Sequence, residues 1–179
     1  MTIEISGIGQ LTICPGTLCD YDKLSRFHYR NGRPAMVSQV WSLVNDSGNV
    51  VSRIKGVHDV REVVGVLVVS YPTLNCKGRN LVNPKYVQIR DKRASAKALN
   101  RDIRRISRVV IHPRWRGLGL AVRLVKHAMG QSETRYLEAL AVMGRVHPFL
   151  EKAGMQRYEV DTVETTPLYY FYEHTGKEN

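Results

Sequence analysis

Apolar residues in this chain fall in short runs, separated by stretches that are polar or rich in glycine and proline. Residues 62–70 (EVVGVLVVS) are the most continuous run, which predicts a central strand covered on both faces of a sheet. Residues 36–44 and 104–111 predict two further strands, the second entered by alternating polar and apolar positions. Looser alternation over residues 2–13 indicates one or two opening strands before a Cys-Pro-Gly turn.

The segments between these strands predict short helices and one long irregular stretch. A helix capped by Asp20 would turn Leu24 and Phe27 inward, whereas residues 71–95 show no clear period. Further strands are expected at residues 136–142, 158–163 and 168–172, and a short helix at residues 96–102. This order predicts one α/β domain over residues 1–179, with a mixed sheet and helices on both faces.

Residues 109–125 (VVIHPRWRGLGLAVRLV) carry the most specific motif, a buried strand followed by a His-Pro turn, a glycine-bearing loop and a helix start. Gly117 and Gly119 allow a sharp turn, and the first amides of the next helix have no intrahelical acceptor. The helix dipole and three nearby arginines, Arg114, Arg116 and Arg123, add positive charge. The motif therefore predicts a phosphate site, although it satisfies neither the dinucleotide nor the nucleotide-triphosphate fingerprint.

The pattern [RQ]-x-x-G-x-[GA] is met by Arg116, Gly119 and Ala121, directly after the His-Pro turn. Here the chain resembles the GNAT superfamily of acyl-CoA-dependent N-acyltransferases, closely over residues 104–160 and loosely elsewhere. The resemblance implies a splayed pair of parallel strands, residues 104–111 and 136–142, and acetyl-CoA or another acyl-CoA as cofactor. It implies that the cofactor contacts the backbone of Val109, Val110 and Ile111 and the residues Arg114, Arg116, Gly117, Leu118, Gly119, Leu120 and Ala121. The alternative is an ordinary strand–turn–helix connection whose glycines serve only the turn.

Acyl transfer to an amine needs groups that remove and supply protons. GNAT proteins usually carry a tyrosine acid in the short helix near residue 150, but this chain has Leu150 there, so no acid is assigned. Glu138 on the second splayed strand is a candidate base, and a solvent-facing or salt-bridged glutamate is the alternative. The other candidates for catalysis are His147, which could be only a cap residue, and the weaker Ser107 and Tyr158.

The basic residues are concentrated in one part of the chain. Residues 77–116 contain thirteen Lys or Arg and two acids, so this window alone accounts for the whole net charge of +11. Such a block is typical of proteins that meet phosphate polymers, and DNA or tRNA is therefore an expected partner. A solvated loop on an enzyme for small-molecule or protein amines is the alternative, as is a nucleic-acid-binding GNAT module without catalysis. The acceptor-binding candidates are His28, Tyr29, Arg30, Arg33, Lys92, Arg93, Arg104 and Arg105.

A narrower resemblance rests on short motifs: a His-Tyr pair at residues 28–29, a Val-Gly-Val strand that ends in Ser-Tyr-Pro at residues 70–72, and Ile-Ser-Arg-Val-Val before the cofactor turn. Together they are similar to the Mom-type branch, phage proteins that modify adenine in DNA, and to acetyltransferase domains fused to ABC-type ATPases. This resemblance implies a modified DNA base as one acceptor.

Composition sets the remaining limits. A chain of 179 residues with 43% hydrophobic content can bury one good core, and no apolar run is long enough to span a bilayer. Since no secretory signal is recognisable either, a cytoplasmic protein without a membrane partner is expected. Cys14, Cys19 and Cys76 lack zinc-site spacing, so reduced thiols and no metal are expected. A homodimer remains open.

Overall fold

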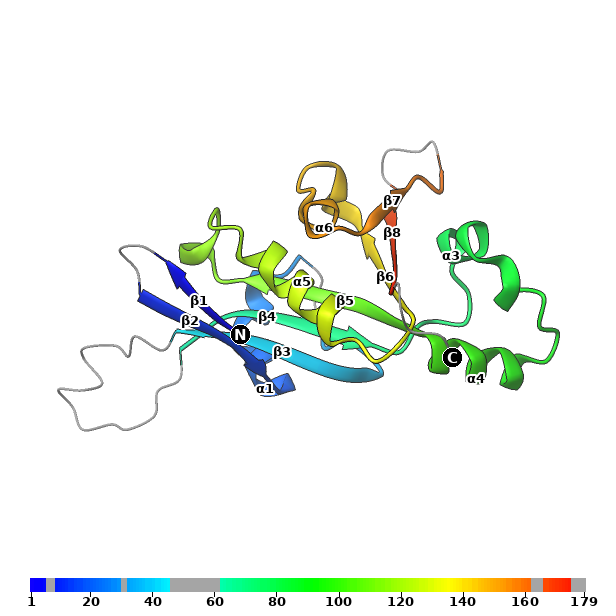
Figure 1. Ribbon diagram of the computed structural model, residues 1–179, viewed down its shortest axis with the longest axis horizontal. Coiled ribbons are helices and arrows are strands. Elements are labelled where there is room, and N and C mark those ends of the chain that lie inside the picture. The colour runs from blue at the N-terminus through cyan, green and yellow to red at the C-terminus, as the bar shows by residue number, and fades with distance from the viewer. Residues whose placement is uncertain (6–8, 30–31, 46–61, 162–165, 175–179) are drawn as a thin grey trace.

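The computed structural model describes residues 1–5, 9–29, 32–45, 62–161 and 166–174 (Figure 1). Within these residues, one eight-stranded sheet has the order β1-β2-β3-β4-β5-β6-β8-β7. Every neighbouring pair is antiparallel except β5 and β6, which are parallel. The strands are β1 Thr2–Ile5, β2 Gly9–Pro15, β3 Val37–Asn45, β4 Glu62–Ser70, β5 Ile103–Ile111, β6 Tyr136–Ala141, β7 Gln156–Tyr158 and β8 Leu168–Glu173.

Helices cover both faces of the sheet. The α-helices are α1 Leu18–Leu24, α3 Lys77–Val82, α4 Lys92–Asp102, α5 Leu120–Gln131 and α6 Phe149–Ala153, and the 3-10 helices are η1 Ser25–Phe27, η2 Pro84–Tyr86, η3 Pro113–Trp115 and η4 Val142–Arg145. None of the helices in the described ranges has the length and apolar character needed to cross a bilayer. The predicted α/β domain with a mixed sheet is confirmed.

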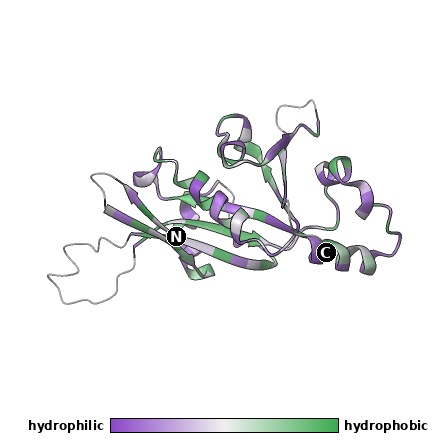
Figure 2. Cartoon of the chain, viewed as in Figure 1, coloured by the Kyte–Doolittle hydropathy of each residue, from purple (hydrophilic) through white to green (hydrophobic). Residues whose placement is uncertain are grey.

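Strand β4 shows how the hydrophobic pattern builds the core. Leu67 and Val69 pack with α5 and α6 on one face, whereas Val66 and Val68 pack with α1 on the other. A third cluster joins α3 and α4 to the outer strands β6 and β8. Figure 2 shows hydrophobic residues concentrated along the central strands. The prediction that residues 62–70 form a central strand buried on both faces is therefore correct.

Several element predictions need correction. The stretch of residues 71–95 is not irregular, because it contains α3, η2 and the start of α4, which begins at Lys92 rather than at residue 96. Strand β7 ends at Tyr158, where the predicted strand was to begin, and residues 162–163 lie outside the described residues. Asp20 is the third residue of its helix rather than the N-cap, and its carboxylate accepts a hydrogen bond from the amide of the N-cap Thr17.

A β-bulge in β5 controls the shape of the sheet beside β6. Val68 pairs with Arg108 but Val69 pairs with Ile106, so Ser107 is an extra residue on β5. The parallel pairing of β5 with β6 stops at the same point, at Ile106 and Ala139. A bulge bends its strand and increases the local twist. The two strands therefore diverge beyond residue 106, which confirms the predicted splay.

Candidate active site

The diverging strands leave one edge of β5 open. The His112 amide donates to the Val64 carbonyl, so alternation along the strand turns the backbone of Val110 toward β4. The backbone groups of Val109 and Ile111 consequently face the open side. Of the three predicted backbone contacts, Val109 and Ile111 are placed for a ligand and Val110 is not. The Val110 side chain is buried against α1.

The loop that follows β5 has the geometry of an anion site. Gly117 and Gly119 have φ angles of 84° and 70°, and a Cβ on either would meet nothing within 4 Å. Gly119 is the N-cap of α5, and the first intrahelical bond is donated by the Arg123 amide. The amides of the first helical turn, Leu120 and Ala121 among them, are thus without helical acceptors. The Leu120 side chain is buried in the core, so only its backbone can serve a ligand.

Arg116 has a second role that the motif did not predict. Its Nε donates to the Ile111 carbonyl at 3.1 Å and its Nη2 to the Phe27 carbonyl at 3.3 Å. Phe27 also packs edge-on against the His112 ring, at 4.9 Å between centroids. Arg116 therefore ties the loop to the end of η1 with two of its nitrogens, while Arg114 is exposed beside it.

Apolar side chains are exposed around the opening. Leu118 on the loop and Leu140 at the end of β6 are each about two-fifths exposed, and η4 with the residue after it adds Val142, Met143 and Val146. Single exposed apolar residues are ordinary, but several of them near an open strand edge are a surface that a partly apolar ligand could cover.

The short helix α6 carries no acid at the expected place. Leu150 is only 3% exposed and belongs to the core cluster under α5. His147 is exposed just before this helix, and its amide donates to the Met143 carbonyl. Of the predicted catalytic residues, His147 is the one that lies on the segment bordering the opening. Ser107 forms the bulge itself, and its hydroxyl contacts the Ser70 hydroxyl at 2.8 Å and donates to the Val68 carbonyl.

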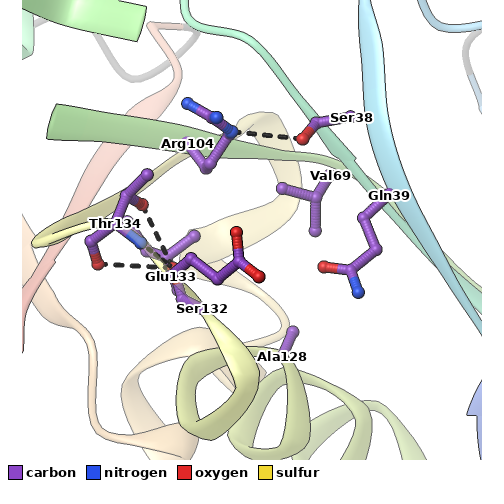
Figure 3. Close-up of a pocket in the computed structure, with 9 residues that line it drawn as sticks. Ser38, Gln39, Val69, Arg104, Ala128, Ser132, Glu133 and Thr134 are labelled. Atoms are coloured by element: carbon purple, nitrogen blue, oxygen red, sulfur yellow. Dashed lines mark hydrogen bonds between the residues drawn. The ribbon is translucent and has the colours of Figure 1, made fainter. Parts of the chain in front are cut away.

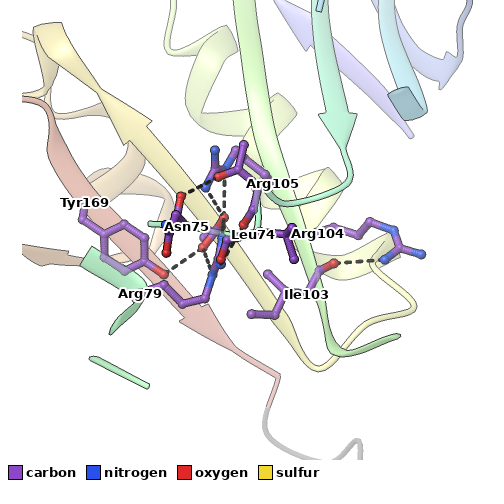
Figure 4. A network of polar contacts seen from close by, with 9 residues as sticks. Leu74, Asn75, Arg79, Ile103, Arg104, Arg105 and Tyr169 are labelled. Carbon is purple, nitrogen blue, oxygen red and sulfur yellow. Dashed lines mark hydrogen bonds and ion pairs between the residues drawn. The ribbon is translucent and has the colours of Figure 1, made fainter. Parts of the chain in front are cut away.

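Glu138 lies in a buried ionic cluster and not in the opening. Its carboxylate accepts four hydrogen bonds, two from Arg79 (2.9 and 2.8 Å), one from Arg105 (2.8 Å) and one from Tyr169 (3.0 Å). Figure 4 shows the side chains of Arg79, Arg105 and Tyr169 converging. Burial alone would raise the pKa of Glu138, but the Arg79 hydrogen bonds and the charges of Arg105 and Arg79 outweigh it, so the pKa is lowered. A fully buried carboxylate of lowered pKa, with both oxygens occupied, is a poor base.

Arg79 is the residue of this cluster that sequence reasoning missed. Both Arg79 and Glu138 have completely buried side chains, and the remaining Arg79 nitrogen donates to the Thr73 and Leu74 carbonyls. Next to it, Gly78 lies flat on Tyr169, where a Cβ would come within 2.2 Å of the ring. The Tyr169 hydroxyl, desolvated and hydrogen-bonded to Glu138, has a raised pKa. The one sequence signal was a charged residue inside the apolar strand YLEALA, which requires a buried partner.

The predicted acceptor residues separate into three groups. His28 and Tyr29 stack at 4.6 Å beside the cofactor loop, and Arg33 is engaged by Asp22 through its Nε at 3.0 Å. Arg105 is only 14% exposed because it is part of the Glu138 cluster, so it does not belong to a surface patch. Lys92 and Arg93 are exposed at the start of α4, and Arg104 is half-buried at its far end. Arg30 lies outside the described residues.

Tyr158 and the cysteines take no part in the opening. Tyr158 packs in the cluster under α3 and α4, with its ring 6.4 Å from that of Tyr169. The three cysteines are free thiols. In the described part of the chain, no group of three His, Cys, Asp or Glu side chains could hold a metal ion.

Comparison with known proteins identifies the fold. No protein-family model and no curated protein matches the chain. A mutant agmatine N-acetyltransferase in its apo form has a TM-score of 0.55 at 8% identity, covering 92% of this chain and 100% of that one. The NatC complex bound to Gag peptide and CoA has a TM-score of 0.55 at 12% identity, covering 92% and 99%. AtaT complexed with acetyl-methionyl-tRNAfMet has a TM-score of 0.50 at 16% identity, covering 91% and 94%. The chain has the GNAT fold.

Proposed function

We propose that this protein is an acyl-CoA-dependent N-acyltransferase, with acetyl-CoA as the donor and an amine carried by nucleic acid as the acceptor. The observation that carries the proposal is the meeting of two features. The open backbone edge of Val109 and Ile111 leads directly into the loop of Gly117 and Gly119 at the start of α5. Two neighbours of the same fold support the proposal, since the NatC structure is bound to Gag peptide and CoA and the AtaT structure is complexed with acetyl-methionyl-tRNAfMet.

Each part of the opening suits a different part of acyl-CoA. The amides of the α5 N-terminus, with the exposed Arg114, suit the pyrophosphate. The backbone of Val109 and Ile111 suits the amide groups of pantetheine, and the exposed apolar side chains of η4 suit its hydrocarbon. The thioester supplies an acyl carbon that an amine can attack.

The reaction makes one bond and breaks another. The acceptor nitrogen bonds to the acyl carbon, the carbon–sulfur bond breaks, and the electron pair leaves with sulfur as a thiolate while the nitrogen loses a proton. We assign the Val109 amide to the oxyanion and the exposed His147 imidazole to the departing proton. Glu138 is left out because its carboxylate is buried and fully bonded. Leu150 stands where GNAT proteins usually carry a tyrosine, and its buried apolar side chain cannot protonate the departing thiolate.

The acceptor is assigned from charge. Arg90, Lys92, Arg93 and Lys97 are exposed on or next to α4, and none of them forms an ion pair within the described residues. A polyanion is the partner that such a surface attracts. A modified base in DNA, as the similarity to Mom-type proteins implies, and an aminoacyl group on tRNA are both acceptors of this class.

Calorimetry with acetyl-CoA tests the donor half of the proposal. The protein should bind acetyl-CoA, and Gly119→Glu should abolish binding because a carboxylate would stand among the amides that receive the pyrophosphate. Arg116→Ala should weaken acetyl-CoA binding because the loop loses two hydrogen bonds that hold it. Arg135→Ala is the control, since Arg135 pairs with Glu173 and not with the loop, and it should leave acetyl-CoA binding unchanged. Absence of binding, or binding that Gly119→Glu does not alter, would refute this assignment.

Transfer of labelled acetyl groups tests the acceptor half. The panel contains tRNA, DNA, a polyamine and a protein amine, and label is expected on a nucleic-acid acceptor. Label on the polyamine or protein alone would support an enzyme for those amines, and acetyl-CoA binding without any transfer would support a non-catalytic module. His147→Gln should lower kcat, because the imidazole is the assigned base.

A further inference from the structure

A polar cavity of about 230 Å³ lies away from the opening, where β5 begins (Figure 3). Its walls come from the start of β3, from Arg104 on β5 and from residues 132–134 after α5. Val69, Ala128 and Leu137 give it an apolar side. Typical ligand pockets measure about 300–1,000 Å³, so this one fits a single ring system and not a whole nucleotide.

The wall of the cavity next to α5 is rich in hydrogen-bond acceptors. Ser132 is the C-cap of α5, so the negative end of that helix dipole lies here. Glu133 follows it, and Figure 3 shows its carboxylate extending into the cavity, with the Gln39 amide on the other side. Glu133 forms no ion pair within the described residues. This wall therefore favours a ligand group that donates hydrogen bonds, such as an amino group.

Arg104 adds positive charge to the same cavity. Its Nε donates to the Ser38 hydroxyl at 3.1 Å, its Nη1 donates to the Asn100 and Ile103 carbonyls, and its guanidinium lies 4.3 Å from the Tyr71 ring centroid. These contacts hold the guanidinium in place and leave Nη2 available for an anion. The bond to Asn100 also joins the cavity to the last turn of α4.

Helix α4 continues this positive charge as a stripe. Arg93, Lys97 and Arg101 stand four residues apart on its exposed side, where like charges destabilise a helix. Arg101 is paired with Asp102, but the other two form no ion pair within the described residues. Arg93 also lies in the first turn, at the positive end of the helix dipole. The charges of Arg93 and Lys97 destabilise the helix and pair with no acid within the described residues, so these two can bind a polyanion.

We infer that this cavity is a base-recognition site for single-stranded nucleic acid. A base with an exocyclic amine enters the cavity and donates to Glu133, Arg104 binds the adjoining phosphate, and the strand continues along α4. This inference rests on the proposed nucleic-acid acceptor and adds a sequence preference to it. Cytosine fits and uracil does not, because uracil carries a carbonyl oxygen where cytosine has its amine, facing a carboxylate.

The cavity lies close enough to the proposed acyl-transfer site for the recognised base and the acceptor amine to belong to the same strand of nucleic acid. Arg104 precedes the bulge at Ser107 by three residues, about 10 Å along an extended strand. Stacked nucleotides rise about 3.4 Å each, so the recognised base would lie a few nucleotides from the acceptor amine. A free amino acid would satisfy Glu133 and Arg104 but would leave the α4 stripe without a partner.

Fluorescence anisotropy with labelled 12-residue oligonucleotides tests the site without acyl-CoA. The probes are oligo(C) and oligo(U) as RNA and oligo(dC) and oligo(dT) as DNA, each at low and moderate salt. We expect about tenfold tighter binding of the cytosine probes, the size of one good base contact. The RNA and DNA arms show which sugar the site accepts. Since acyl-CoA is absent, a failure of acetyl-CoA binding would refute the proposed function without affecting this measurement.

Four variants separate base recognition from charge. Glu133→Gln should reduce the preference for cytosine to less than about threefold, because an amide can also donate to the uracil oxygen. Glu4→Gln makes the same charge change on an exposed residue of β1 and should keep the full preference. Lys97→Gln should weaken all probes alike and lower the salt slope by about one. Gln39→Ala provides a second change in the cavity and should also narrow the preference.

Four results would overturn the inference. The first is no binding of any probe at low salt, and the second is equal binding of cytosine and uracil probes. The third is a cytosine preference that survives Glu133→Gln and Gln39→Ala. Displacement of the cytosine probe by free amino acids but not by cytidine monophosphate would assign the cavity to a zwitterion and would equally overturn it.

Discussion

The two ends of β5 are built in different ways. At its C-terminal end, the loop of Gly117 and Gly119 is made of residues that follow one another in sequence, and it leads to the first amides of α5, which have no helical acceptors. At its N-terminal end, Arg105 joins Arg79 and Tyr169 around Glu138, so four elements meet through side chains. A loop built from consecutive residues can be predicted from the sequence, whereas a cluster of side chains from distant segments cannot.

The difference extends to energetics. The loop glycines leave open space around them, so the loop contributes little packing. The Glu138 cluster is closed, and its charges are removed from water at a cost that only mutual pairing offsets. We infer that the cluster specifies where α3 docks, since Arg79 connects that helix to β6.

The largest effect should come from removing one side of the cluster. Arg79→Met leaves a buried carboxylate with Arg105 as its remaining cation and should lower the free energy of unfolding by about 3–5 kcal/mol. Urea denaturation measures this, with Arg114→Met as an exposed control expected to change stability by less than about 0.5 kcal/mol. A loss below about 1 kcal/mol for Arg79→Met would show that the cluster is not the main support of α3.

Lowering the pH should reduce the stability that the Glu138 cluster contributes and leave the loop of Gly117 and Gly119 unaffected. The folded pKa of Glu138 is below its ordinary value of 4.5, so its stabilising contribution is complete above that pH and is lost as the pH falls through the lowered pKa. The unfolding free energy of the native protein should therefore fall from about pH 5 to about pH 3. Glu138→Gln, less stable at neutral pH, should lose less over the same interval. Parallel pH profiles for the two proteins would contradict this assignment.

A methyl group on the loop should affect binding more than stability. Gly119→Ala places a side chain at a φ of 70°, which costs about 1–2 kcal/mol, and puts a Cβ in the open space beside the amides. Acetyl-CoA affinity measured by calorimetry should fall at least about tenfold. Gly130→Ala is the matched control, because it lies inside α5 with open space around it and should stabilise by up to about 1 kcal/mol without changing affinity. Equal affinity in both variants would refute the loop assignment.

The smallest effect concerns α4 alone. The Asp91 carboxylate caps this helix by accepting hydrogen bonds from the Arg93 and Ala94 amides. Asp91→Ala should cost about 1 kcal/mol, and Asp91→Asn, which keeps a capping oxygen, should cost less. Hydrogen exchange should show faster exchange of the α4 amides in the alanine variant while the α5 amides keep their rates. Faster exchange in both helices would mean that the two regions unfold together.

Prediction from sequence succeeded where a pattern is long or local. Residues 62–70 were assigned as a strand from one apolar run, and the loop of Gly117 and Gly119 from the order of its residues. It failed for α3, which has six residues and includes Gly78, too short for a helical period to show. It also misjudged Glu138, because its partner Arg79 lies 59 residues earlier within a run of similar cations.

The sequence by itself determined the sheet-forming segments, the glycine-bearing loop before α5 and the excess of positive charge, because backbone preference, glycine freedom and net charge act over short range. Only the tertiary structure decided how that charge is divided. It buries Arg79 and Arg105 around Glu138, leaves Lys97 exposed on α4, and brings Arg104 to a cavity that also contains Glu133. Burial and ion pairing depend on which distant segments of the chain come into contact, and no local pattern of residues specifies those contacts.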